Sequence, residues 1–307
     1  MTTLKIGTRE SRLALWQATF VRDRLLAMHS DLEVELVGIS TQGDRNQEAL
    51  VAIEGGKGLF LKELEEALLD GRVDLAVHSM KDVTAKLPEG LHIPVICERG
   101  DPRDALIFKK NEGLRDLSYG ATVGTCSLRR QCLLRHRVPD VRTIPLRGNV
   151  DTRLQRLDQG DFDAIILAVA GLRRLDLEQR IGRIFAVEDM LPAVGQGAIG
   201  IECRVDDPLT STAIQPLDHA DTHLRVRAER AANEALGGSC HLPIAFFAEL
   251  SDTILRIRGM VGTTDGSEVL FANEQGSVQD TVEIGQRVAK TLRDQGAERI
   301  LRDVGAN

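Results

Sequence analysis

Residues 163–169 read Asp-Ala-Ile-Ile-Leu-Ala-Val, an almost unbroken apolar run. Such a run is typical of a strand in a parallel sheet that helices cover on both faces, because all of its side chains are then buried. Parallel strands need crossover helices, so we expect strands and helices to alternate before this run. The expected elements there are a strand over 121–124, a helix over 128–136, a strand over 143–146 and a helix over 150–157.

The N-terminal part of the chain shows the same alternation. Residues 74–78 are expected to form a buried strand, and residues 79–82 (Ser-Met-Lys-Asp) follow it directly. Ligands of open α/β sheets bind beyond the carboxyl ends of strands, so polar side chains at this point are candidate functional residues. The other expected elements are a strand over 4–7, a helix capped by Thr8 or Ser11 that runs to about Met28, a strand over 33–40, a helix over 59–69 and a strand over 198–202.

The pattern changes after Pro216 into a small α+β region. Its expected elements are a helix over 219–236, strands over 243–249, 254–261 and 269–272, and a closing helix over 278–295. At 307 residues a single core usually divides, and we expect three domains. The expected boundaries are 1–98 with 198–216 for the first domain, 99–197 for the second and 217–307 for the third.

Composition excludes several classes of protein. With 42% hydrophobic and 28% charged residues the chain supports packed cores, and its apolar runs are far shorter than the ~20 residues that span a bilayer. Five scattered cysteines without a C-x-x-C pair exclude a disulfide framework and suit a reducing compartment. The histidines lack metal-ligand spacing, and the N-terminus lacks a secretion signal. We therefore expect no metal, no membrane partner and a cytoplasmic location.

Positive charge is concentrated in one segment of an acidic chain. The formal net charge is −7, yet residues 129–156 contain eight arginines and two aspartates and so carry +6. Guanidinium groups hold carboxylates and phosphates bidentately, and helix starts attract anions through their free N–H groups. Several of these arginines lie at expected helix starts. The eight are Arg129, Arg130, Arg135, Arg137, Arg142, Arg147, Arg153 and Arg156.

This segment is expected to bind a small molecule with several negative charges. The alternative is that the arginines pair with Asp140, Asp151 or other acids of the chain. A nucleic-acid partner is disfavoured, because aromatic residues are 3% of the chain and the segment has none to stack on bases.

Two further positions can carry chemistry. A carboxylate beside a cation, as in Lys81-Asp82, can exchange protons or stabilise developing positive charge, although such an Asp is often a helix cap. Cys240 follows Gly-Gly-Ser and precedes His241, which favours an exposed thiolate, against the alternative of a buried thiol. Acyl-transfer triads around Cys240 or Ser127 lack a nucleophile elbow and a partner histidine motif.

Eight segments in the same order resemble the porphobilinogen deaminase family over nearly the whole chain. They are residues 7–17 (GTRES and LALWQ), 55–60 (GGKGLF), 77–83 (VHSMKDV), 124–130 (GTCSLRR), 146–150 (LRGNV), 167–172 (LAVAGL), 191–197 (LPAVGQG) and Cys240 with Pro243 and Ile244. Each segment alone is a weak signal, but the set in order is specific.

The resemblance implies a fold and a reaction. The fold is two periplasmic-binding-protein-like (type II) α/β domains plus a small α+β C-terminal domain. The reaction joins four porphobilinogen molecules head to tail into hydroxymethylbilane with release of ammonia, in tetrapyrrole (haem or chlorophyll) biosynthesis. The implied cofactor is dipyrromethane, made from two substrate molecules and held by a thioether to Cys240. The implied catalytic residue is Asp82, and the implied enzyme is a transferase that works as a monomer.

The resemblance also implies binding roles, mostly for polar residues. Cofactor binding falls on Asp82, Lys81, Ser127, Arg129, Arg130, Arg147 and Ala168. Substrate binding falls on Arg9, Ser11, Gln17, Lys57, Arg147, Arg153, Arg174 and Gln196. Each substrate carries an acetate and a propionate, and a buried carboxylate without a partner costs several kcal/mol. An arginine-rich site suits such a substrate on physical grounds as well.

Three positions depart from the family pattern: Ser239 stands directly before the cysteine, Ile53 precedes the glycine loop, and Thr84 replaces a common proline. The alternative function is a non-enzymatic small-anion-binding protein of the periplasmic-binding type. That alternative gives no reason for Cys240 in a third domain.

Overall fold

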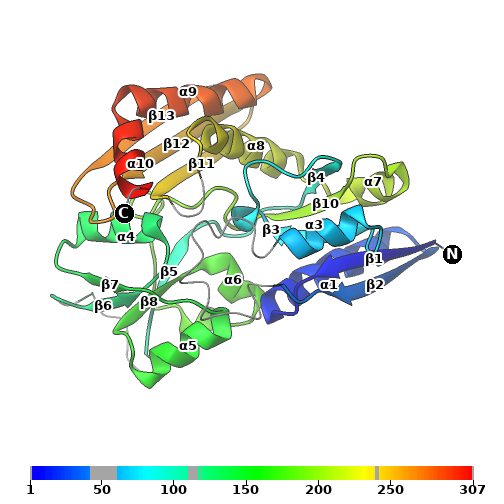
Figure 1. Cartoon of the computed structure of the whole chain (residues 1–307), viewed down its shortest axis with the longest axis horizontal. Helices are drawn as coiled ribbons and strands as arrows, with labels where there is room; N and C mark the ends of the chain where they lie inside the picture. The colour runs from blue at the N-terminus through cyan, green and yellow to red at the C-terminus, as the bar shows by residue number, and fades with distance from the viewer. Residues whose placement is uncertain (1, 42–60, 110–116, 118, 239–241, 306–307) are drawn as a thin grey trace. The chain divides into compact units, whose positions relative to one another are not determined.

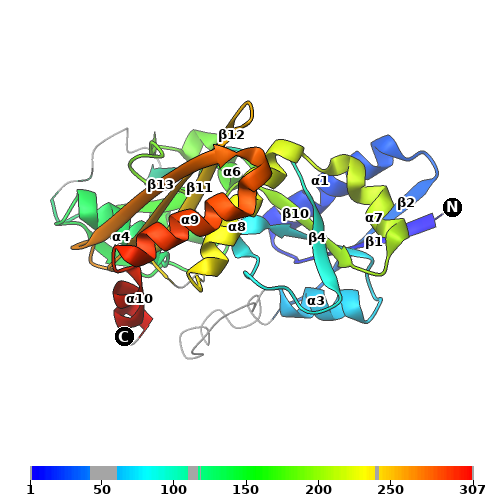
Figure 2. The same ribbon diagram turned by 90° about the horizontal axis from the view of Figure 1, so that it is seen from above.

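The computed structural model describes residues 2–41, 61–109, 117, 119–238 and 242–305. The chain forms two compact units, each treated by itself: Met1–Arg99 with Ala198–His223, and Gly100–Gly197 with Leu224–Asn307. Figure 1 labels most of the helices and strands, and Figure 2 shows the same ribbon turned by 90°. The division of the second unit into two domains stays a prediction.

The first unit contains a five-stranded mixed sheet in the order β2-β1-β3-β10-β4. β1 runs parallel to β2 and β3, whereas β10 runs antiparallel to β3 and β4. The strands are β1 (Thr2–Thr8), β2 (Leu32–Gly38), β3 (Leu75–Ser79), β4 (Leu91–Ile96) and β10 (Ile199–Arg204). The helices are α1 (Arg12–Met28), α3 (Lys62–Leu69) and α7 (Pro208–Ile214), with 3-10 turns η2 (Met80–Asp82) and η4 (Gln215–Leu217).

Helices cover both faces of this sheet because successive side chains of a strand point to opposite sides. Leu75 and Val77 of β3 pack in one core with Val21 and Leu25 of α1. Ala76 packs in a separate core that contains the buried residues of α3. Residues 75–78 are therefore buried, because cores lie against both faces of the strand.

The second unit contains another five-stranded sheet, in the order β7-β6-β8-β5-β9. Its strands are β5 (Asp104–Phe108), β6 (Thr122–Gly124), β7 (Arg142–Ile144), β8 (Ala164–Ala168) and β9 (Arg183–Ile184). Its helices are α4 (Leu128–Arg137), α5 (Val150–Gln159) and α6 (Val169–Arg174), with the 3-10 turn η3 (Glu178–Arg180).

The apolar run 163–169 forms β8, the central strand of this sheet. β8 is parallel to β6 but antiparallel to β5, so the expected parallel surroundings are wrong for one of its two neighbours. An apolar run predicts that both faces of a strand are buried. It does not predict whether the neighbouring strands are parallel or antiparallel, because burial does not depend on their direction.

An antiparallel three-stranded sheet completes the second unit. Its strands are β11 (Ile244–Ser251), β12 (Ile254–Gly262) and β13 (Val269–Ser277). The accompanying helices are α8 (Ala220–Ala235), which belongs to this unit from Leu224 onward, α9 (Thr281–Asp294) and α10 (Ala297–Gly305), with the 3-10 turn η5 (Val278–Asp280). Residues of α8 and α9 share one core with the sheet, and Phe247 joins a second core with Leu133 of α4. This is the expected combination of two α/β sheets and a small α+β region.

Candidate functional site

In the first unit, predicted site residues follow the carboxyl ends of two neighbouring strands. β1 and β3 are parallel, with Gly7 opposite Ala76, so both strands end at the same edge of the sheet. Arg9 and Ser11 follow β1, and residues 80–82 follow Ser79, the last residue of β3. The register therefore brings these predicted residues to one edge, as expected for an open α/β sheet.

Ser11 and Gln17, two of the predicted substrate-binding residues, make structural contacts near this edge. The Ser11 side chain accepts a hydrogen bond from the Ala14 N–H at 3.4 Å and caps α1. The Gln17 side chain is 3% exposed, and its Nε2 donates to Ser79 Oγ at 2.8 Å, which ties α1 to the end of β3. Both residues thus fix the shape of the edge.

Asp82 is the last residue of a 3-10 turn and is exposed. The turn is anchored by Met80, which is 2% exposed and whose N–H donates to Ala198 O at 3.0 Å. Gly200 lies against Met80 so closely that a Cβ there would collide with Met80 Sδ. The buried Met80, two residues before Asp82, anchors the turn that carries this exposed carboxylate, and Lys81 between them is half-buried.

A buried hydrogen-bonded pair that the sequence did not suggest joins β3 to β10. His78 Nε2 is 2.8 Å from Glu202 Oε2, and both side chains are at most 3% exposed. Burial, followed by the negative charge of Glu202, raises the pKa of Glu65 on α3, and His78 opposes this rise. The pair joins β3 to β10 directly below the turn that carries Asp82.

In the second unit, three parallel strand ends carry predicted residues. β7, β6 and β8 are parallel neighbours, so their carboxyl ends share one edge. Arg147 follows β7, Ser127 follows β6, and Ala168 ends β8. Ser127 and Asn149 cap the helices that start there, since their side chains accept from Arg130 N and Thr152 N. Both helix starts of this edge are thus closed by a polar side chain.

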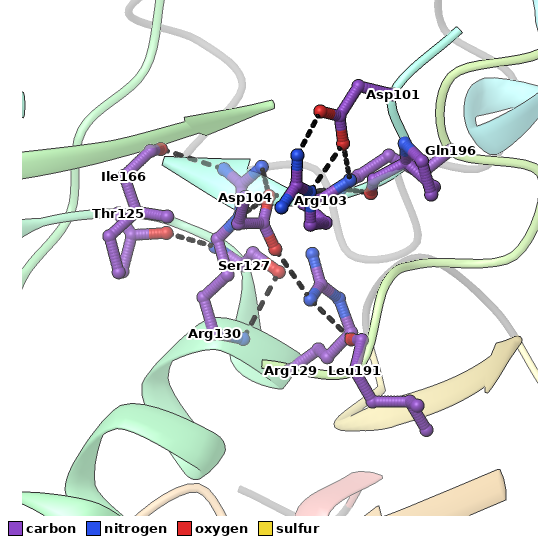
Figure 3. A network of polar contacts seen from close by, with 11 residues as sticks. Asp101, Arg103, Asp104, Thr125, Ser127, Arg129, Arg130, Ile166, Leu191 and Gln196 are labelled. Carbon is purple, nitrogen blue, oxygen red and sulfur yellow. Dashed lines mark hydrogen bonds and ion pairs between the residues drawn. The ribbon is translucent and has the colours of Figure 1, made fainter. Parts of the chain in front are cut away.

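Arg129 and Arg130 point back from the first turn of α4 onto one carboxylate, Asp104 (Figure 3). Arg129 Nη1 donates to Asp104 Oδ2 at 2.8 Å, and Arg130 Nη2 donates to Oδ1 at 2.6 Å. Carbonyl oxygens accept from the same guanidinium groups, Leu191 O from Arg129 and Ile166 O from Arg130. For these two arginines, the alternative that they pair with an acid of the chain is therefore correct. The acid is Asp104, which the sequence did not suggest.

The three charged groups are buried, and this sets their electrostatics. Arg129 is 3% exposed, Arg130 6% and Asp104 0%. Burial alone would raise the pKa of Asp104, but the two arginines outweigh it and lower the pKa to about 2. Asp104 is therefore ionised at neutral pH. Arg129 Nε is buried and has no hydrogen-bond partner among the described residues, so the pair retains capacity for an anion.

The other predicted residues of this unit differ in their contacts. Arg147 is exposed and makes no ion pair within the described part of the chain. Arg174 Nη2 donates to Gly197 O at 2.6 Å, and Gln196 Nε2 donates to Asp104 Oδ1 at 3.1 Å. Arg153 is half-buried on α5.

Other arginines of the basic segment stabilise the fold. Arg135 donates to Thr264 O, Arg137 pairs with Asp189, and Arg156 pairs with Asp161. The basic segment thus divides into structural arginines and arginines at the strand ends.

Lys57 and Cys240 lie outside the described residues, so the structure does not test their predicted roles. Within the described residues, no group of three His, Cys, Asp or Glu side chains is arranged to hold a metal ion. The same part of the chain contains no helix with the length and apolar character needed to span a bilayer.

Two five-stranded α/β sheets with polar groups at their strand ends, together with a small α+β region, define a mixed α/β protein with candidate ligand sites at the strand ends. Similar solved structures are the methionine-binding protein MetQ (15% identity, 76% of this chain and 94% of that chain, TM-score 0.45), the BvgS VFT2 domain of Bordetella pertussis (15%, 69% and 85%, 0.44) and a mutant of arginine-bound ArgBP from T. maritima (13%, 70% and 93%, 0.37).

Family models give the more specific result. The model for the porphobilinogen deaminase dipyromethane cofactor binding domain matches residues 4–212, and the model for the porphobilinogen deaminase C-terminal domain matches residues 223–294. The chain therefore belongs to the porphobilinogen deaminase family. It is a hydroxymethylbilane synthase type of transferase, which joins four porphobilinogen molecules and carries a dipyrromethane cofactor.

Proposed function

We propose that the strand ends of the two α/β sheets divide the work of this reaction. Asp82, at the edge of the first sheet, moves protons on the substrate, and the arginines at the edge of the second sheet bind carboxylates. The supporting observation is the register of the sheets, which brings the family's site residues to the carboxyl ends of parallel strands. These ends are where ligands of such folds bind.

The residues present fit a dipyrromethane, whose two pyrroles each carry an acetate and a propionate. Arg129 keeps a buried Nε without a partner in the described chain, and Arg147 is exposed at a helix start. Carboxylates satisfy such donors through charge-assisted hydrogen bonds. The residues that would hold the cofactor are Lys81, Asp82, Ser127, Arg129, Arg130, Arg147 and Ala168. When bound, the cofactor supplies the pyrrole carbon to which the first substrate is joined.

In this proposal, Asp82 acts as the acid and base of each addition. As an acid it donates a proton to the amine nitrogen that leaves the substrate as ammonia. As a carboxylate it then stabilises the positive charge on the substrate ring and removes the proton from the ring carbon that forms the new bond. The fixed turn at Met80 keeps this carboxylate at the edge of the sheet.

The substrate's own carboxylates need separate partners. We assign Arg9, Ser11 and Gln17 in the first unit, Arg147, Arg153, Arg174 and Gln196 in the second, and Lys57. Ser11 and Gln17 contribute mainly by shaping the edge, since their side chains cap α1 and hold Ser79. The arginines neutralise a polyanion that gains two charges with each substrate.

Cys240 is assigned as the anchor that holds the cofactor through a thioether. The described cysteines, Cys97, Cys126, Cys132 and Cys203, are free thiols, which supports a cytoplasmic location with its reducing conditions. We further propose that the protein works as a monomer on a small-molecule substrate, without a nucleic-acid partner.

Intact mass and turnover test this assignment. The purified chain should carry a mass increment of two condensed pyrroles and should convert porphobilinogen with release of ammonia. Cys240→Ser should lack the increment, whereas Cys126→Ser, a half-buried thiol, should keep it. A wild-type chain with the bare mass and no turnover would reject the assignment in favour of a binding protein.

Asp82→Asn should keep the increment and the fold but lower turnover about 10²- to 10⁴-fold, the usual contribution of a positioned acid or base. Asp70→Asn removes an exposed carboxylate of the same unit and should leave turnover unchanged. Turnover of Asp82→Asn close to that of the wild type would reject its catalytic role.

A further inference from the structure

Asp104 is a buried carboxylate to which neither the sequence analysis nor the proposed reaction assigns a role. It is the first residue of β5 and is 0% exposed. Its two oxygens accept hydrogen bonds from three side chains of the anion site: Arg129 Nη1, Arg130 Nη2 and Nε, and Gln196 Nε2. These contacts arise from segments that are distant in sequence and meet at this one residue, as Figure 3 shows.

The contacts decide which edge of each guanidinium group stays available. Arg129 gives Nη1 to Asp104 Oδ2 and to Leu191 O at 2.8 and 2.7 Å, and its Nε has no partner among the described residues. Arg130 gives Nη2 and Nε to Asp104 Oδ1 and Nη1 to Ile166 O at 2.8 Å. These contacts fix the orientation of both guanidinium groups. The donors of Arg129 that they do not use, such as Nε, can bind an incoming carboxylate.

Asp104 also sets the charge of the site. Two guanidinium groups side by side in a buried place repel each other, and the repulsion is strong because the local dielectric is low. One carboxylate between them reduces the net charge of the cluster to +1. This charge is constant at working pH, since Asp104 titrates far below neutrality.

We propose that Asp104 is a positioning residue of the reaction: it holds Arg129 and Arg130 in the orientation and at the net charge that align the bound carboxylates for each addition. This inference rests on the proposed carboxylate-binding role of the two arginines. Asp104 touches neither substrate nor cofactor and acts through the arginines.

Asp104→Asn in the full-length, cofactor-loaded protein separates two effects: the orientation of Arg129 and Arg130, and the net charge of the cluster. Turnover is normalised to the fraction of molecules that carry two pyrroles by intact mass. If the arginines no longer align the bound carboxylates, this normalised turnover falls about 10- to 100-fold, the usual result of misplacing a reacting group by about 1 Å. The KM for porphobilinogen does not rise, because the site gains a positive charge, and KM becomes more sensitive to salt for the same reason.

Asp104→Glu keeps the charge but moves the carboxylate. Its KM should depend on salt as in the wild type, while its normalised turnover stays reduced. Asp207→Asn is the matched control, since Asp207 is paired with Arg204 in the first unit and its pKa is also lowered, burial being outweighed by hydrogen bonds from Thr210 and Arg204. It should lose stability without changing normalised turnover or the effect of salt.

The Asp104 variants have results that support the positioning role and results that overturn it. Reduced normalised turnover with a steeper salt dependence of KM in Asp104→Asn supports the inference, as does failure of a folded Asp104→Asn protein to take up cofactor while Asp104→Glu takes it up. If Asp104→Asn does not fold, Asp104→Glu carries the test, and wild-type turnover there overturns the inference. Wild-type turnover and salt dependence in Asp104→Asn overturn the inference alone. A wild-type protein without pyrroles or turnover overturns the proposed function and this inference with it.

Discussion

At the scale of single residues, the buried cluster around Asp104 links stability to pH. The two arginines hold the pKa of Asp104 at about 2, against roughly 3.9 for an ordinary aspartate. A depressed pKa in the folded state stabilises the fold above the unfolded value, and this contribution disappears as the pH falls through the folded value. For a shift of about 2 units it amounts to about 2–3 kcal/mol.

We therefore expect the free energy of unfolding to fall by about 2–3 kcal/mol from this residue alone between about pH 5 and pH 1. Urea titrations at several pH values in this window measure it. Asp104→Asn should be less stable at neutral pH, because two buried guanidinium groups lose their counter-charge, and its stability should depend less on acid. Equal acid dependence in the two proteins would contradict the assigned electrostatics.

At the scale of elements, helix starts connect local stability to the anion site. Asn149 Oδ1 accepts hydrogen bonds from Thr152 N at 2.9 Å and Thr152 Oγ1 at 2.8 Å, and α5 begins at the next residue. Asn149→Ala should lower the free energy of unfolding by about 1 kcal/mol, as for other N-caps. Asn149→Asp should keep this stability, because aspartate is an equally good cap.

The Asn149→Asp variant tests whether the start of α5 contacts the substrate. It places a negative charge between Arg147 and Arg153, so the KM for porphobilinogen should rise while stability stays near the wild-type value. Urea titration and steady-state kinetics on the same preparations measure both. An unchanged KM in Asn149→Asp would show that the start of α5 does not meet the substrate.

Several elements could be predicted from sequence because their signals are local. Ser11, Ser127 and Asn149 cap the helices that the sequence places after them, and the expected buried strand at 74–78 and the apolar run at 163–169 form central strands. The location of candidate residues at strand ends followed from these elements. Local signals were weaker for β4, β5, α6, α7 and α10, which the sequence analysis missed.

The contacts between elements could not be predicted in the same way. β5 begins with Asp104, a residue type that is rarely buried, and only the arginines 25 and 26 positions later make its burial favourable. The sequence suggested Asp140 and Asp151 as acidic partners because they are near in the chain. The antiparallel direction of β5 relative to β8, and of β10 relative to β3, could not be predicted either. An apolar run does not encode the direction of its neighbouring strand.

At the scale of the whole molecule, the second unit depends on a core that its two sheets share. Phe247 and Met260 of the three-stranded sheet lie in one core with Cys132 and Leu133 of α4. His136 Nδ1 also lies 3.1 Å from Gly266 O in the loop between β12 and β13. The α/β sheet and the small antiparallel sheet of this unit are therefore expected to unfold together.

Phe247→Ala tests this cooperativity. Removing a buried aromatic ring should lower the free energy of unfolding by about 3–5 kcal/mol. Hydrogen exchange should accelerate in α4 as well as in β11, because both lose the same core. Phe271→Ala, which removes a ring that is 49% exposed on β13, should have a small effect. Faster exchange confined to β11 would show that the two sheets unfold independently.

The position of β10 has a consequence for synthesis on the ribosome. β10 is made after residues 100–197, yet it lies between β3 and β4, and β4 has no other partner in the sheet. At a translation rate of about 5–20 residues per second, the nascent N-terminal segment waits about 5–20 s before this strand emerges. During that interval the open side of β3 is a site where a chaperone, or another nascent chain, can pair.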